Sequence, residues 1–195
     1  MELAFNLLGE RIEATPNQTA YCSICKFEVI SKCGNTNIWH WAHKNLKDCD
    51  TWSEGETLWH KEWKERYPVE CREVVMENHR ADIKIKDLII ELQNSSISSD
   101  EIIERENFYN KMIWILNLTE KNINQLEGGD FIIKEKQNKN GNKYLTFKWK
   151  HMKRSFLSAT KPIYLDFGEG YLLLIKKLYP EGTGWGIFVI AEDLQ

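Results

Sequence analysis

The chain has 195 residues, 42% of them hydrophobic, and carries 29 acidic against 26 basic side chains, for a net charge of −3. This hydrophobic fraction is enough for a packed core and excludes an intrinsically disordered chain. The acidic balance argues against a protein that coats nucleic acid through a general excess of positive charge. No apolar run approaches the roughly 20 residues of a membrane-spanning helix, and the N-terminus lacks the basic start of a secretion signal. We therefore expect a cytoplasmic protein that does not associate with membranes.

Residues 1–50 are expected to form a small unit around a zinc ion. Residues 1–20 favour a short strand or hairpin, and a compact Cys/His segment follows. The chain has five cysteines, an odd number that does not suit a disulfide framework. Two of them, Cys22 and Cys25, have the spacing with which a pair of thiolates grips one face of a tetrahedral zinc site.

The second pair of zinc ligands is expected further along this segment. We favour His43 with Cys49, which gives a Cys₃His site. His40 is the main alternative, because its spacing from His43 would also allow a Cys₂His₂ site, and Cys33 is a further candidate. Each set supplies four protein ligands and leaves no position for water, so the zinc would be structural rather than catalytic.

A helix is predicted next, over residues 53–67. Ser53 followed by Glu56 has the pattern of a capping box, and Pro68 ends the helix. The apolar side chains recur at helical spacing and form one buried face: Trp59, Trp63 and Tyr67.

Three short strands in a row, a second helix and a buried strand are predicted after this helix. The strands cover residues 69–76, 80–85 and 88–93. Ser99 or Asp100 can cap the second helix, which runs to about Lys111, and the apolar residues 112–118 favour a buried strand. This order predicts an α/β or α+β layer fold whose core spans residues 51–120.

Residues 121–195 are expected to form a β-rich extension without a recognisable motif. Its predicted strands cover residues 131–136, 144–150, 163–167, 171–176 and 186–191. The extension could complete the fold, bind a strand or mediate self-association, and its sequence does not separate these roles.

Two acidic residues mark the row of three predicted strands. Asp82 interrupts an apolar alternation, and Glu91 follows two isoleucines in the next strand. Side chains paired across adjacent antiparallel strands have Cβ atoms about 5 Å apart, so two carboxylates there favour a cation such as Mg²⁺ or Mn²⁺. Such an ion can activate water for attack on a phosphodiester. Gln93 shares the face of Glu91 and can hold that water, whereas solvated strand positions are the plain alternative for both acids.

A series of sequence motifs carries a family resemblance: Cys22-Ser-Ile-Cys25, His40-Trp-Ala-His43, Cys49-Asp50-Thr-Trp52-Ser-Glu54, Trp59-His60-Lys61-Glu62-Trp63, His79-Arg80-Ala81-Asp82-Ile83 and Ile90-Glu91-Leu92-Gln93-Asn94-Ser95. Over about residues 20–118 the chain resembles the competence protein CoiA-like family, a branch of the PD-(D/E)xK nuclease superfamily. The resemblance implies a PD-(D/E)xK nuclease-like core of helix, three-strand meander, helix and strand, preceded by the zinc knuckle.

The resemblance also implies an activity, the hydrolysis of phosphodiester bonds by a deoxyribonuclease that uses Mg²⁺ or Mn²⁺. DNA is expected in preference to RNA, with a role in DNA uptake, recombination or defence. Asp82 and Glu91 would bind the metal ion. Gln93 stands where many members of the superfamily carry a catalytic lysine, and its amide can orient water but supplies no charge. The superfamily often adds an acid or a histidine from the helix before the meander, and His60 is the first candidate for this role and Glu56 the second.

Further residues are candidates for contacts with nucleic acid: Arg80, Lys64, Arg105 and Tyr109. Lys64 continues the helix face that carries His60. Arg105 and Tyr109 lie four residues apart on the second helix, where packing explains the spacing equally well.

A non-catalytic, zinc-containing module that binds nucleic acid on a nuclease-like fold is the alternative function. The glutamine at position 93 and the acidic net charge favour it. The presence of both Asp82 and Glu91 favours the nuclease, because a pure binder has no use for acids that face phosphate.

Overall fold

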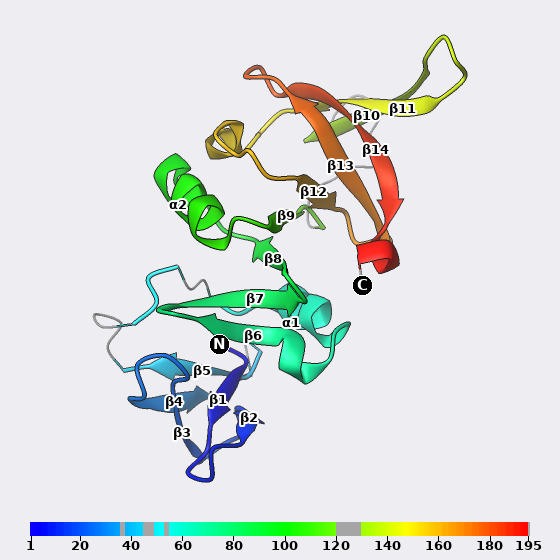
Figure 1. Ribbon diagram of the computed structural model, residues 1–195. Coiled ribbons are helices and arrows are strands. Elements are labelled where there is room, and N and C mark those ends of the chain that lie inside the picture. Colours follow the sequence, from blue (N-terminus) through cyan, green and yellow to red (C-terminus); the bar gives the residue numbers. More distant parts are fainter. Residues whose placement is uncertain (36–37, 45–48, 53–54, 120–129, 195) are drawn as a thin grey trace. The chain divides into compact units, whose positions relative to one another are not determined.

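The structure is a computed structural model that describes residues 1–35, 38–44, 49–52, 55–119 and 130–194. These residues form a mixed α+β fold that is mostly sheet, with two α-helices, in agreement with the predicted fold class. The chain divides into two compact units, residues 1–87 and residues 88–195 (Figure 1). None of the helices in the described ranges is long and apolar enough to cross a membrane.

The first unit begins with a small antiparallel sheet, in which the described strands follow the order β2-β1-β3-β4-β5. Their bounds are β1 (Leu3–Phe5), β2 (Arg11–Glu13), β3 (Thr19–Tyr21), β4 (Glu28–Lys32) and β5 (His40–His43). The β1–β2 hairpin agrees with the one expected at the N-terminus. The strands β3 to β5 were not predicted. Segments of three to five residues are too short for an alternation of apolar and polar residues to be recognised. They enclose a core that includes Ala20, Val29 and Trp41.

The helix α1 (Leu58–Glu65) is shorter at both ends than the predicted helix. Its N-cap is Thr57, whose hydroxyl accepts a backbone N–H of the first turn. The prediction of a cap at Ser53, which lies outside the described residues, is therefore wrong. Glu56, the other residue of the expected capping box, forms an ion pair with Lys64. The apolar residues that the spacing assigned to a buried face are buried: Trp59, Trp63 and Tyr67.

A hairpin of β6 (Arg72–Met76) and β7 (His79–Ile85) completes the first unit. A 3₁₀ turn, η1 (Val69–Cys71), replaces the first residues of the strand predicted over residues 69–76. Pro68 precedes this turn, and its fixed φ and missing N–H keep the chain out of a sheet at that point.

The second unit is built on a sheet whose described strands follow the order β10-β11-β14-β13-β12-β9-β8. Their bounds are β8 (Leu88–Gln93), β9 (Met112–Asn117), β10 (Phe131–Gln137), β11 (Lys143–Trp149), β12 (Ile163–Asp166), β13 (Tyr171–Leu178) and β14 (Thr183–Ile190). Strands β8, β9 and β12 are parallel, and the other neighbours are antiparallel. The predicted β-rich extension is present, and it shares a sheet with β8 and β9 because β12 pairs with β9.

The helix α2 (Ser99–Tyr109) lies between β8 and β9 in the chain. Its N-cap is Ser98, whose hydroxyl oxygen accepts the backbone N–H of Glu101 at 3.1 Å. The predicted caps, Ser99 and Asp100, are therefore wrong by one and two residues, because Ser98 and Glu101 already have the spacing of a capping box. Two further 3₁₀ turns complete the described elements, η2 (Arg154–Leu157) and η3 (Ala191–Leu194).

Candidate functional site

Three cysteines and one histidine converge in the first unit. The ligand atoms of Cys22, Cys25, His43 and Cys49 all lie within 4.8 Å of one another. The Cys22 and Cys49 sulfurs are 3.6 Å apart, and the Cys25 sulfur lies 3.3 Å from Nε2 of His43. The turn after β3 supplies the first two residues and the end of β5 supplies the histidine, so the short strands bring the set together.

The chemistry of this cluster fits a zinc ion. Three sulfurs and one imidazole nitrogen form a four-ligand set that closes a tetrahedron. Burial lowers the pKa of His43, which keeps its ring neutral, as coordination requires. Burial, with a further contribution from the Cys22 thiol, raises the pKa of Cys49 to about 12, so a proton occupies this thiol until a cation displaces it. The Cys₃His cluster is therefore compatible with zinc.

His40 and Cys33, the alternative zinc ligands, lie outside this cluster. His40 begins β5, and its Nδ1 is 2.8 Å from the carbonyl oxygen of Ile38. Cys33 is partly buried against the apolar core of the small sheet. The geometry thus favours the set that contains His43 and Cys49.

Asp50, the residue after the last cysteine of the cluster, ties this region to β7. Its buried carboxylate accepts the backbone N–H of Arg80 at 3.0 Å and lies 2.9 Å from Nδ1 of His79. The His79 ring stacks on Trp52, with ring centroids 3.3 Å apart. Sequence reasoning missed Asp50, and its position directly after a candidate zinc ligand is the signal that could have found it.

A pocket of about 220 Å³ adjoins the cluster. His43 and Cys49 line it together with Glu56 and Arg80. The sequence assigned these last two residues to catalysis and to nucleic-acid binding. The zinc-compatible cluster and two of the candidate site residues therefore share one cavity within the first unit.

Lys64 on α1 is fully buried, with an exposed fraction of 0%. Its ammonium lies 2.6 Å from Glu56, 3.2 Å from Glu73 and 3.4 Å from Glu2. Burial alone would lower the pKa of Lys64, but these carboxylates raise it. A side chain held in this way cannot reach phosphate at the surface, so we assign Lys64 a structural role in place of the expected contact with nucleic acid.

Glu73 is the centre of this buried network. Its carboxylate also accepts the backbone N–H groups of Glu2 and Leu3, at 2.8 and 2.9 Å. Burial alone would raise the pKa of Glu73, but Lys64 and Arg80 hold it well below its usual range. Its φ of 46° is a left-handed conformation, which costs on the order of 1 kcal/mol in a residue with a Cβ and which these contacts offset. Sequence reasoning missed Glu73, whose weak signal is a charged residue next to two valines.

Asp82, the first expected metal ligand, lies on β7 and is partly buried. The hairpin register pairs its neighbours Ala81 and Ile83 with the residues on either side of Glu73. Burial alone would lower the pKa values of Lys64 and Arg80. The carboxylate of Glu73 raises both pKa values, and that of Asp82 raises them further. Asp82 therefore belongs to the electrostatic surroundings of the same network.

The two catalytic candidates at the start of α1 have different surroundings. His60 is buried, and its Nδ1 lies 2.7 Å from the hydroxyl of Thr57, so its ring is engaged in the helix cap. Glu56 lines the pocket beside the zinc-compatible cluster and contacts Lys64. Glu56 therefore lies at the pocket, whereas His60 is not among the residues that line it.

The candidate residues of the second unit lie on β8 and α2. Glu91 and Gln93 are both buried, and the Glu91 carboxylate accepts a hydrogen bond from Arg105 at 2.8 Å. Arg105 also forms an ion pair with Glu101. Arg105 and Tyr109 are buried, so their spacing reflects the packing of α2 and not an exposed grip on phosphate.

The side-chain amide of Gln93 has an open acceptor. Its Nε2 donates to the carbonyl oxygen of Ser95 at 3.3 Å. Its Oε1 has no hydrogen-bond partner among the described residues, although the residue is only 1% exposed. Buried side-chain oxygens are nearly always hydrogen-bonded, so this atom is positioned to accept from a water molecule or a ligand.

Comparison with known proteins gives two family matches. Residues 6–51 match the model described as "Competence protein CoiA, N-terminal domain", and residues 58–170 match "Competence protein CoiA, nuclease-like domain". The second match alone spans more than half of the chain. Searches of curated proteins and of solved structures found no match. On these two family matches, which follow one another in the order that the sequence motifs imply, the chain belongs to the competence protein CoiA family.

Proposed function

We propose that the protein is a metal-dependent nuclease of the PD-(D/E)xK type that hydrolyses phosphodiester bonds of DNA. The open acceptor of Gln93 carries the proposal: it lies on a buried strand, two residues after Glu91, in the region that matches the nuclease-like domain. A buried oxygen without a partner costs about 1–3 kcal/mol, and a bound water molecule would offset that cost.

The order of the elements supports the same proposal. Along the chain α1, β6, β7, β8, α2 and β9 follow one another as helix, three strands, helix and strand. This is the order that a PD-(D/E)xK core has, and we assign these elements to it.

In this proposal Asp82 and Glu91 supply oxygen ligands for Mg²⁺ or Mn²⁺, ions that prefer such donors. When bound, the ion would lower the pKa of a water molecule and offset the charge that develops at phosphorus. The Gln93 amide oxygen accepts a hydrogen bond from the attacking water and fixes its orientation. Arg105 keeps the Glu91 carboxylate in one orientation through their hydrogen bond.

The Cys₃His cluster has a structural role in this proposal. Its four ligands hold zinc and leave no position for water, and its thiols suit a reducing compartment such as the cytoplasm. Membership of the competence protein CoiA family supports a function in DNA uptake, recombination or defence.

The test is a cleavage assay on labelled single- and double-stranded DNA and RNA, with Mg²⁺, with Mn²⁺ and with neither. We expect the protein to cut DNA only when one of the ions is added. Asp82→Asn and Glu91→Gln are expected to reduce the rate by at least about 100-fold, since loss of even an outer-shell partner of a metal ligand costs up to that factor. Lys86→Gln, an exposed change in the turn before β8, is the matched control, and zinc content and thermal unfolding check that each variant is folded.

Binding of nucleic acid without cleavage under every ion condition, unchanged in both acid variants, would overturn the nuclease proposal. The zinc-containing binding module would then be the better account. The acidic net charge of −3 and the glutamine at position 93 are the observations that favour this second candidate.

Gln93 offers a finer test of the mechanism. Gln93→Ala removes the open acceptor, and because the attacking water is then misplaced we expect the single-turnover cleavage rate to fall by about 100-fold. Substrate affinity should change little, since the amide contacts water and not the substrate. Gln137→Ala, at an exposed position of β10, is the control. A Gln93→Ala rate within twofold of the wild type would remove Gln93 from the mechanism.

A further inference from the structure

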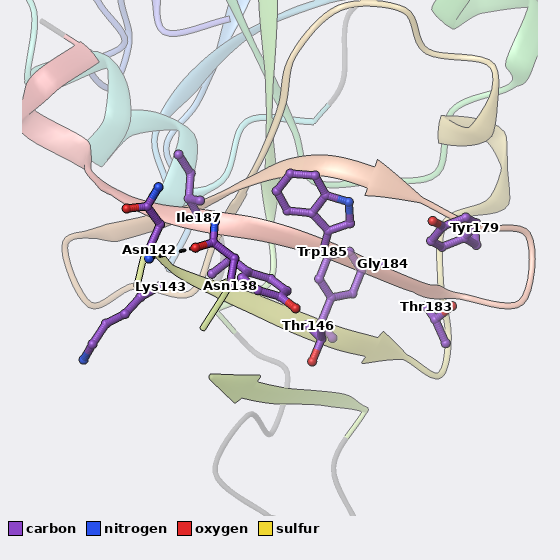
Figure 2. A pocket seen from close by; sticks show the side chains of 11 residues that line it. Asn138, Asn142, Lys143, Thr146, Tyr179, Thr183, Gly184, Trp185 and Ile187 are labelled. Atoms are coloured by element: carbon purple, nitrogen blue, oxygen red, sulfur yellow. Dashed lines mark hydrogen bonds between the residues drawn. The ribbon is translucent and has the colours of Figure 1, made fainter. Parts of the chain in front are cut away.

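An open groove of about 810 Å³ lies on the sheet of the second unit (Figure 2). Residues of β11, of β14 and of the turns before these two strands line it. Trp185 lies in its middle, with Tyr179 toward one end and Asn138 and Asn142 toward the other. None of the residues assigned to cleavage lines it. The β14 side of the groove lies beyond residue 170, where the match to the nuclease-like domain ends.

Two exposed aromatic rings line this groove. Trp185 is 39% exposed and Tyr179 is 42% exposed, whereas six of the eight tryptophans are buried. Tyr144 packs edge-on against Trp185, with ring centroids 6.0 Å apart. A tryptophan that is not needed for the core, and that a neighbouring ring holds in place, is a platform on which a planar group can stack.

Two glycines flank Trp185 and keep the strand close to its neighbours. A Cβ at Gly184 would lie 2.4 Å from the Phe147 ring, and a Cβ at Gly186 would lie 2.4 Å from the carbonyl oxygen of Leu174. The sheet face behind these glycines is therefore closed. Side chains on β14 have room on the side that carries Trp185.

Lysines surround the aromatic rings on the same face. Residues directly opposite on neighbouring strands share a face of a sheet. The register places Lys136 opposite Tyr144, Lys134 opposite Thr146, and Lys177 opposite Trp185. Lys148 follows Thr146 by two positions and so shares its face. All four lysines are exposed.

The charged side chains on this face are mostly lysines, with few acids among them. Glu135 pairs with Leu145 in the register, and its carboxylate lies 2.9 Å from Nζ of Lys143, a lysine that lines the groove. Glu181, in the turn before β14, accepts a hydrogen bond from Thr183. Residues 130–194 carry eleven lysines and arginines against seven acids, a net charge of +4 in a chain whose total is −3. Within the second unit the excess of positive charge therefore lies in residues 130–194, because residues 88–129 carry three basic against seven acidic side chains.

We propose that this face, the Trp185 groove, binds single-stranded nucleic acid. Bases stack on Trp185 and Tyr179, and the phosphates contact the surrounding lysines, as in platforms that bind single strands with little sequence preference. A duplex keeps its bases stacked on one another and cannot offer them to these rings. The groove therefore gives the protein a second nucleic-acid contact, separate from the residues assigned to cleavage.

The experiment measures binding by the full-length protein of a fluorescein-labelled oligothymidine, and of a matched duplex, by fluorescence anisotropy. The buffer contains no added Mg²⁺ or Mn²⁺, so zinc is retained and cleavage is not needed for the signal. We expect the single strand to bind more tightly than the duplex, and Trp185→Ala to weaken single-strand binding by about 5- to 100-fold. Trp185→Phe should restore most of the affinity because a flat ring is kept.

The lysines are tested through the dependence of affinity on salt. Replacement of Lys134 and Lys177 by glutamine should lower the slope of log K against log salt concentration by about 1.4, at roughly 0.7 for each phosphate contact on a single strand. The controls are Phe188→Ala, an exposed aromatic residue on the opposite face of β14, and Lys86→Gln in the first unit.

Single-strand affinity and salt slope that are the same in the Trp185, lysine and control variants would overturn the proposal. So would the absence of single-strand binding, or a change of oligomeric state on Trp185→Ala with nucleic-acid binding unaltered, which would assign the groove to a second copy of the chain. These outcomes are independent of the nuclease assay. Cleavage can fail while the groove binds, and the groove variants can bind normally while cleavage proceeds.

Discussion

Removal of zinc is expected to unfold the small sheet of the first unit. The strands β1 to β5 are three to five residues long, and their core consists of a few side chains such as Ala20, Val29 and Trp41. A core of this size cannot offset the conformational entropy of the segment. A structural zinc ion contributes apparent binding free energies of about 10–16 kcal/mol in small zinc domains, which is as large as the stability of a whole domain.

The measurement combines metal analysis with hydrogen exchange. We expect about one zinc ion per chain, and chelation or Cys25→Ser should release it. Amide exchange should then rise through β1 to β5, whereas the amides of β9 and β12 in the second unit should stay protected. Cys33→Ser is the matched control, because Cys33 lies outside the cluster and should leave the zinc content unchanged.

A protein that contains no zinc after expression in zinc-supplemented medium would contradict this prediction. An exchange pattern that does not respond to chelation would also contradict it. Loss of zinc from Cys33→Ser but not from Cys25→Ser would instead assign the site to the alternative ligand.

Glu73→Gln is expected to destabilise the protein by about 3–5 kcal/mol at pH 7, the cost of breaking a buried ion pair on one side. Lys64 would keep its ammonium in a fully buried position with part of its neutralising charge removed. The same change weakens the acceptor for the N–H groups of Glu2 and Leu3. Glu70→Gln, an exposed carboxylate three residues earlier, should change the free energy of unfolding by less than about 0.5 kcal/mol.

The effect of Glu73→Gln should depend on pH in a defined direction. The pKa of Glu73 is held well below its usual range in the folded state, so its carboxylate stabilises the fold above the unfolded pKa of about 4.5. That contribution is lost as the pH falls further. Burial raises the pKa of Glu2, which acts in the opposite sense, and the difference between wild type and Glu73→Gln separates the two.

Urea unfolding of both proteins between pH 3 and 7 checks this prediction. The stability difference should be full near neutral pH and should shrink below about pH 4.5. A difference under about 1 kcal/mol at pH 7, or one that grows on acidification, would mean that the network around Lys64 does not stabilise the fold in the way its geometry indicates.

The elements of this fold that follow local rules could be predicted from the sequence. The strand β8 has the bounds that its apolar run indicated, and α2 begins within two residues of its predicted start. The four zinc ligands preferred from the sequence, Cys22, Cys25, His43 and Cys49, are the ones that cluster in the structure. The roles of Asp82, Glu91 and Gln93 in catalysis stay predictions.

The buried network and the groove could not be predicted in this way. Lys64, Glu73 and Glu2 meet across separations of up to 71 positions, and no local pattern marks side chains that pair at such a distance. The spacing of Arg105 on α2 fitted a phosphate contact and helix packing equally well, and its partner Glu91 lies on another element, β8. The face around Trp185 is formed with strands β10, β11 and β13. Sequence spacing alone does not show that these strands share a sheet with β14.

The contacts of Glu73 and Asp50 bear on how freely the two matched regions can be exchanged between relatives. Residues 6–51 and 58–170 match as separate families, which suggests interchangeable modules. The hydrogen bonds from Glu2 and Leu3 to Glu73, and from Arg80 to Asp50, cross between the small sheet and the β6–β7 hairpin. A chimera that takes its first 50 residues from another member of the family would keep the backbone donors for Glu73, but it would leave the Arg80 N–H without its acceptor unless the new segment also ends on an acid at position 50.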